Sequence, residues 1–200
     1  MSSWAFGVYQ SDDSMDWEST IYEVAGIDED GDDDKEFNRD DPAHRGTLEQ
    51  GLPAILAAID DVKRNNDETT GYQKSVGYQM LACILMRHGC VVPADTQQTI
   101  IAGILACPEY QLVKELLDRA GATEVTNDMV RPATLKDPFG PEGMRNRFNG
   151  RFSALTRLAK EFGEYDINAG QIYEYRDKGA LELYGVTEEE AARHPGRYPF

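Results

Sequence analysis

Residues 72–88 read Tyr-Gln-Lys-Ser-Val-Gly-Tyr-Gln-Met-Leu-Ala-Cys-Ile-Leu-Met-Arg-His. The apolar side chains of this stretch recur at helical spacing at Val76, Met80, Cys83, Ile84 and Met86. Gly89 follows directly, and a glycine in this place is typical of the end of a helix. The stretch therefore predicts a strongly apolar helix that ends at residue 88.

Helical periodicity also marks the chain on both sides of this stretch. The further predicted helices are residues 11–25, 47–64, 95–107, 109–120 and 142–162. Loops of about two to eight residues between such helices favour antiparallel packing of neighbours. We expect a mainly α fold, namely a compact antiparallel helical bundle with an acidic N-terminal loop and an irregular Pro/Tyr-rich C-terminal portion. Residues 1–121 would form the helical domain, and residues 122–200 would pack on it as part of one structural unit.

Local signals predict where several of these helices begin and end. Thr47-x-x-Gln50 matches a capping box, which places Pro53 close to the first turn of its helix. Asp95 is a candidate N-cap, and Gly121 stands where a C-terminal glycine belongs.

Negative charge is concentrated at the N-terminal end of the chain. The 200 residues include 36 acidic and 20 basic side chains, for a formal net charge of -16. Residues 1–43 hold 14 of the acidic and 2 of the basic side chains. Such a field repels nucleic acid and anionic membranes and attracts basic partners. We therefore expect a basic protein partner, no nucleic acid and no membrane.

Cysteine usage bears on the compartment. Cys83, Cys90 and Cys107 are too few and too unevenly spaced for a disulfide framework. In apolar helical stretches a thiol generally behaves as a small buried hydrophobic group. The first residues also lack the pattern of a secretion signal. These features predict a cytoplasmic protein, and nothing in the sequence calls for a cofactor.

The acidic residues form two candidate binding segments. Asp12, Asp13 and Asp16 lie at the start of a predicted helix, where the helix dipole favours negative charge and a carboxylate-lined site could form. The second segment, residues 28–41, has one aromatic and no aliphatic side chain, which predicts a solvated acidic loop. Its candidate binding residues are Asp30, Asp32, Asp33 and Asp34.

The acidic loop only partly follows the pattern of a calcium loop that starts at Asp28. A calcium loop needs glycine at its sixth position and glutamate at its twelfth, where this chain has Asp33 and Arg39. The spacing of Cys83, His88, Cys90 and Cys107 likewise matches no known zinc site. We therefore expect no metal centre.

Residues 144–160 carry five basic and no acidic side chains on a predicted helix with an aromatic stripe. The basic residues are Arg145, Arg147, Arg151, Arg157 and Lys160. The stripe consists of Phe148, Phe152, Leu155, Ala159 and Phe162, which we expect to face the core. Three interpretations stay open: surface arginines above a buried stripe, pairing with the acidic loop, or binding of phosphate or an acidic partner. The candidate binding residues here are Arg145, Arg147 and Arg151.

The N-terminus carries a motif with a known counterpart. Its positions are Trp4, Gly7, Tyr9, Asp12, Ser14, Asp16 and Trp17. The motif resembles the opening of domain of unknown function 4259, although Ala5 and Ser11 stand where that family usually has glycine and asparagine. The resemblance implies a shared fold for the helices up to about residue 120 and no particular activity. From the residues alone, we expect Trp4 and Trp17 to pin the first helix to the core.

No catalytic motif accompanies these features. The chain has no Gly-x-Ser-x-Gly, no P-loop and no His-Glu-x-x-His sequence. We therefore expect a non-enzymatic interaction domain that presents an acidic surface to a basic protein, in the manner of an inhibitor or immunity protein. The alternative is a hydrolase in which Asp12, Asp13 or Asp16 acts with a divalent metal.

Overall fold

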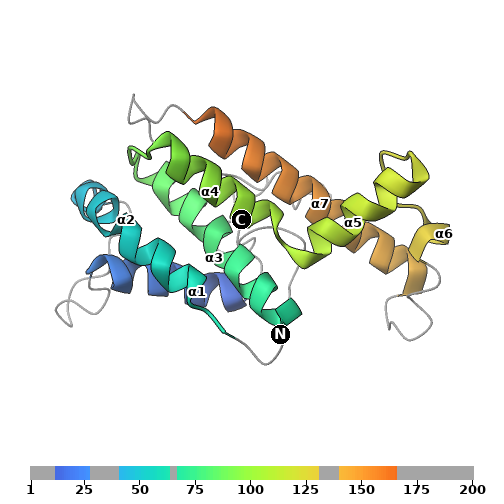
Figure 1. The fold of residues 1–200 in the computed structure, drawn as a ribbon, viewed down its shortest axis with the longest axis horizontal. Coiled ribbons are helices and arrows are strands. Elements are labelled where there is room, and N and C mark those ends of the chain that lie inside the picture. Colours follow the sequence, from blue (N-terminus) through green and yellow to red (C-terminus); the bar gives the residue numbers. More distant parts are fainter. Residues whose placement is uncertain (1–11, 28–40, 64–66, 131–139, 166–200) are drawn as a thin grey trace, which may run out of the picture.

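The computed structural model describes residues 12–27, 41–63, 67–130 and 140–165 (Figure 1). The helices in this part of the chain are α1 (Asp12–Ala25), α2 (His44–Asp60), α3 (Asp67–Arg87), α4 (Ala94–Leu105), α5 (Pro108–Ala120), α6 (Asn127–Val130) and α7 (Gly140–Glu164). These ranges contain no strand. The predicted mainly α fold is confirmed, while the short helix α6 lies where the sequence pattern predicts only irregular structure.

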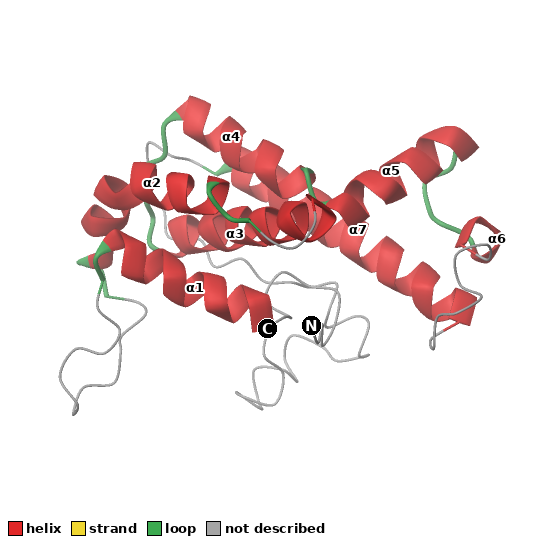
Figure 2. Cartoon of the chain, turned by 60° about the horizontal axis from the view of Figure 1, so that its bottom comes forward, coloured by secondary structure: helices red, strands yellow, loops and turns green. Residues whose placement is uncertain are grey.

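Helix α3 is the centre of the arrangement. It contacts α1, α2, α4, α5 and α7, and in Figure 1 it runs between the α1–α2 pair on one side and α4 on the other. Helix α7 packs along α4 and α5. Both views show α5, α6 and the first turns of α7 extending beyond the end of the bundle, and we call this part the arm (Figure 1, Figure 2).

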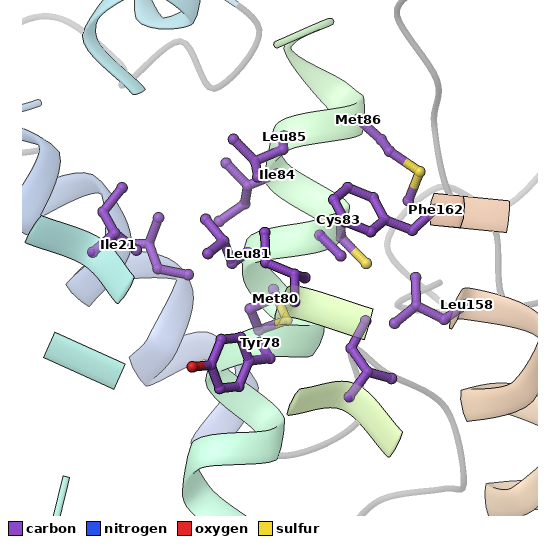
Figure 3. Packing of buried hydrophobic residues seen from close by; sticks show 14 of the residues in the cluster. Ile21, Tyr78, Met80, Leu81, Cys83, Ile84, Leu85, Met86, Leu158 and Phe162 are labelled. Atoms are coloured by element: carbon purple, nitrogen blue, oxygen red, sulfur yellow. The ribbon is translucent and has the colours of Figure 1, made fainter. Parts of the chain in front are cut away.

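The main core follows from the composition of α3. Its residues Met80–Met86 are all buried, and side chains from α1 and α7 pack around them, such as Ile21 and Phe162 (Figure 3). A helix that is apolar on all sides has to be covered on all sides. Helix α3 is therefore the helix around which the others assemble.

The arm has a smaller core of its own. Its buried residues are Val113, Leu117, Val125, Val130 and Phe148. Phe152 packs against both cores and stacks on Tyr110, with ring centroids 4.6 Å apart. Four of the five stripe residues of α7 are buried and Phe152 is half-buried, as predicted for a core-facing stripe.

The predicted starts of α2 and α3 are wrong, and α3 begins at Asp67 rather than at residue 72. Helix α2 begins at His44, so Thr47 and Gln50 lie inside it, and Asp41 Oδ1 accepts the Ala43 N–H (2.8 Å) just before it. Pro53 consequently lies well inside α2, where its ring removes one backbone donor. Thr47 is therefore not the N-cap, because residues 44–46 before it are already helical.

The predicted end of α5 is confirmed, whereas the predicted cap of α4 is wrong. Gly121 adopts the left-handed conformation (φ +59°), and Ala122 N–H donates to the Leu117 carbonyl (3.1 Å), as in a glycine-ended helix. Asp95 is not the N-cap of α4, because the helix already begins at Ala94 after Pro93.

Gly103 permits the close approach of α4 to α3, since a Cβ atom there would overlap the Tyr78 ring. That ring is buried, and its hydroxyl donates to Asp60 Oδ1 (2.8 Å). We expect Gly103→Ala to lower the free energy of unfolding by about 1–3 kcal/mol, because added volume in a packed core forces strain. Thermal and urea unfolding followed by circular dichroism measure this loss.

Two further variants control for the alanine itself. Gly46→Ala lies in α2 with no atom within 4 Å of the new Cβ, so stability should hold or rise by up to about 1 kcal/mol. In a Tyr78→Leu background, Gly103→Ala should cost much less than in the parent. An equal cost in both backgrounds would show that the ring is not the obstacle.

Candidate functional site

The described face of α1 is acidic and solvent-exposed. Asp16 and Glu23 are exposed together with Ser19, one helical turn apart in each case, and Met15 beside them is 64% exposed. Helix α1 contains five acidic residues and no basic residue. We call Met15, Asp16, Ser19 and Glu23 the acidic face.

The other predicted acidic residues differ in what the structure shows of them. Asp13 is half-buried on α1. The side chain of Asp12, and the whole of Asp30, Asp32, Asp33 and Asp34, lie outside the described residues. The prediction that these aspartates form one binding surface with the acidic face stays a prediction.

All five basic residues of α7 lie close to carboxylates of the helical body. Arg147 donates to Glu109 of α5, and Arg157 Nε donates to Glu161 Oε1 (3.0 Å). Arg145 Nη2 lies 3.7 Å from Glu142 Oε1. Lys160 Nζ likewise lies 4.0 Å from Glu164 Oε1, and Arg151 Nε lies 4.0 Å from Glu109 Oε2. Residues 144–160, which include no acidic side chain, thus lie close to carboxylates that flank them in α7 or that belong to α5.

Arg151 is buried, with 7% of its surface exposed, and it belongs to a polar network inside the bundle. Its Nη2 donates to Gln79 Oε1 (2.9 Å), Gln79 Nε2 donates to Ser75 Oγ (2.9 Å), and Ser75 Oγ donates to the Ile104 carbonyl (3.0 Å). The network therefore ties α7 to α3 and α4. A surface position for this arginine, which the first interpretation of the basic stretch assumes, is wrong.

The structure brings Asp13 and Arg151 towards one side chain. Burial raises the pKa of Tyr72, Arg151 acts to lower it, and Glu109 and Asp13 raise it further. Two of the predicted binding residues, from opposite ends of the described chain, thus share an electrostatic environment.

Sequence reasoning missed a cluster of three rings from α1, α2 and the residue that follows α3, in which Tyr22 and His88 are buried and His44 is half-buried. Tyr22, His44 and His88 have pairwise centroid distances of 5.6–6.0 Å. The Tyr22 hydroxyl and His88 Nε2 are hydrogen-bonded at 2.9 Å. Beside them, Arg87 Nη1 donates to buried Glu18 (2.8 Å). No sequence signal marks the cluster, since its members are up to 66 residues apart.

Cys90, two residues after His88 in the chain, has an unreactive thiol. Burial first, and then Glu49, raises the pKa of Cys90 to about 12, which Arg45 offsets only in part. A thiol with such a pKa is protonated at neutral pH and is a weak nucleophile. Cys83 and Cys107 are also free and buried, as predicted.

Two features are absent from the described residues. No group of three or more His, Cys, Asp or Glu side chains in these ranges is placed to hold a metal ion. Within the same ranges, no helix has the length and apolar character needed to cross a membrane.

Comparisons with known proteins add no relative. No family model, no curated protein and no solved structure matches the chain. The resemblance to domain of unknown function 4259 therefore stays a prediction, with Trp4, Gly7 and Tyr9 of its motif outside the described residues.

Proposed function

We propose that this protein is a non-enzymatic interaction domain that binds a basic protein through the acidic face of α1, in the manner of an inhibitor. The proposal rests on the number of charged side chains among the described residues and on which of them form ion pairs. These residues include 20 acidic and 11 basic side chains. Nine of the 11 basic side chains lie within 4.0 Å of a carboxylate: Arg45, Lys63, Arg87, Lys114, Arg145, Arg147, Arg151, Arg157 and Lys160.

The described residues include nine more acidic than basic side chains (20 against 11), and α1 contributes five of the acidic residues and no basic one. A concentrated field of one sign speeds the association of an oppositely charged partner by about 10–10³-fold. Exposed Met15 adds apolar area at the edge of the acidic face. An acidic surface that includes a methionine is suited to a basic partner that also has an apolar side chain in its interface. The buried, free cysteines support placing this interaction in the cytoplasm.

A basic amphipathic peptide of alternating lysine and leucine pairs tests the proposal. We expect saturable binding in fluorescence anisotropy that weakens steeply between low and high salt, because exposed charges are screened. Asp16→Asn combined with Glu23→Gln should weaken binding about three- to tenfold, since exposed pairs contribute up to about 1 kcal/mol each. Met15→Ala should weaken it further without changing the salt dependence.

The controls keep the number of charges equal. Asp95→Asn with Glu115→Gln removes two exposed carboxylates from α4 and α5 and should change the affinity less than twofold. A variant with Asp32→Asn, Asp33→Asn and Asp34→Asn measures the contribution of the acidic loop. Equal losses for the acidic-face variant and the α4–α5 control would mean that only net charge matters, and the proposal would fail.

A further inference from the structure

The dipeptide Asn149–Gly150 lies inside α7, and it is the one place in the 200-residue sequence where an asparagine precedes a glycine. Both residue types have low helix propensity, and the Asn-Gly pair is among the strongest turn signals. The local preference of the pair thus conflicts with its helical conformation. In a folded protein such a conflict is expected where the residues have a further structural or functional task.

The structural task of Asn149 is to join α7 to the segment that leads into α6. Asn149 Oδ1 accepts the Val125 N–H (2.8 Å), and Asn149 Nδ2 donates to the Val125 carbonyl (3.0 Å). Val125 itself is buried in the core of the arm. A carboxamide carries both the acceptor and the donor that this pairing needs, whereas a carboxylate carries acceptors only. The closed form of the arm therefore depends on the amide of Asn149.

The same dipeptide has a specific chemistry, because asparagine deamidates most readily when the next residue is glycine, which has no side chain to hinder the attack. The backbone nitrogen of Gly150 gives up its proton and forms a bond to Asn149 Cγ. The bond from Cγ to Nδ2 breaks, and Nδ2 leaves as ammonia with that proton. Water then opens the five-membered imide at either of its carbonyls, and the product is aspartate or isoaspartate.

The closed arm protects Asn149–Gly150 from this reaction in two ways. In an α-helix each backbone N–H donates to the carbonyl four residues earlier, so the nitrogen of Gly150 is engaged within α7. The carboxamide of Asn149 is held by Val125 and cannot turn towards that nitrogen. Both restraints are lost when the arm opens.

Opening of the arm needs less free energy than unfolding of the whole bundle. The arm extends beyond the end of the bundle, and its core consists of five buried residues (Figure 2). Within the described residues the main core is several times larger. Segments with few buried apolar contacts open more often than the rest of a protein. A local motion that leaves the main core intact therefore removes the protection of Asn149.

We propose that Asn149–Gly150 is a deamidation site that makes opening of the arm irreversible. In the product, the aspartate turns an oxygen towards the Val125 carbonyl, to which Nδ2 donates before the reaction, and the two acceptors repel each other. Isoaspartate also places an additional methylene group in the backbone of α7, which interrupts the helical hydrogen bonds. Neither product re-forms the pairing with Val125, so the arm does not return to its closed form.

Mass spectrometry after proteolysis measures the conversion of Asn149 during incubation of the full-length protein at mildly alkaline pH. A synthetic peptide of residues 144–154 has no arm and is the unprotected reference. We expect conversion in the folded chain to be at least about tenfold slower than in the peptide, because its rate scales with the fraction of time that the arm is open. Equal rates in the two would overturn the inference.

Two core variants identify the motion that admits the reaction. Leu117→Ala removes a buried side chain from the core of the arm and should raise the rate at Asn149 at least about threefold, since the arm opens more often. Leu52→Ala removes the same side chain from α2 in the main core and should change the rate by less than about twofold. An unchanged rate in Leu117→Ala, or equal acceleration by both variants, would overturn local opening as the cause.

Asn149→Asp reproduces one product and shows what deamidation does to the arm. Hydrogen exchange of the backbone amides of residues 113–130 should be at least about fivefold faster than in the parent, because the closed arm is less populated. Asn146→Asp introduces the same charge at an exposed position of α7 and should change the exchange by less than about twofold. Parent-like exchange in Asn149→Asp would show that the arm still closes after deamidation. That result, or equal acceleration by Asn146→Asp, would overturn the inference.

Discussion

Replacing Trp17 with alanine is expected to lower the free energy of unfolding by about 3–5 kcal/mol, the usual cost of removing a large buried aromatic side chain. Trp17 is 6% exposed and belongs to the main core. It packs so closely on α3 that a Cβ atom at Gly77 would lie 3.0 Å from its Cε2. Neighbouring side chains cannot fill the space of an indole, so a cavity remains.

Chemical and thermal unfolding followed by circular dichroism measure this effect. Met15→Ala, two residues away and 64% exposed, is the matched control and should change stability by less than about 0.5 kcal/mol. Gly77→Ala approaches the same contact from α3 and should also destabilise. A loss below about 1 kcal/mol for Trp17→Ala would mean that α1 is not anchored by this ring. Burial of Trp17 confirms half of the sequence-based expectation, while Trp4 lies outside the described residues.

The second large effect concerns Arg151. Arg151→Ala should lower the free energy of unfolding by about 3 kcal/mol, because breaking a buried polar pair leaves the remaining partner unsatisfied. The affected partner is Gln79, whose Oε1 accepts from Arg151 at 2.9 Å. Loss of Arg151 affects Glu109 less, since the Glu109 carboxylate still accepts a hydrogen bond from Arg147. The same helix offers a control in Arg157→Ala, where a half-exposed pair with Glu161 is lost and about 0.5 kcal/mol is expected.

A double replacement tests whether the cost comes from the polar network itself. Arg151→Met keeps much of the side-chain volume and leaves Gln79 unsatisfied, so it should destabilise. Arg151→Met with Gln79→Leu replaces both partners by apolar groups, and it should recover most of the loss. Additive losses in the double variant would show that the two side chains act independently, contrary to the hydrogen bond between them.

Position 151 also shows what could have been predicted from the sequence and what could not. It lies three residues after Phe148 and four before Leu155, so helical periodicity places it on the core-facing stripe. An arginine on that stripe indicates either a buried polar network or a break in the stripe. Its partner Gln79 is 72 residues away, and no spacing rule connects the two.

The sequence by itself determined the helical class, the order of the main helices and the buried face of α7, because these depend on the period of apolar residues and on local breakers such as Gly121. It failed at the start of α2, where His44 precedes the expected cap. Only the tertiary structure decided which helices surround α3, how Tyr22 meets His88, and that Arg151 is buried. These are contacts between residues far apart in the chain, and they are settled by packing volume and by the need to satisfy buried polar groups, neither of which has a local pattern.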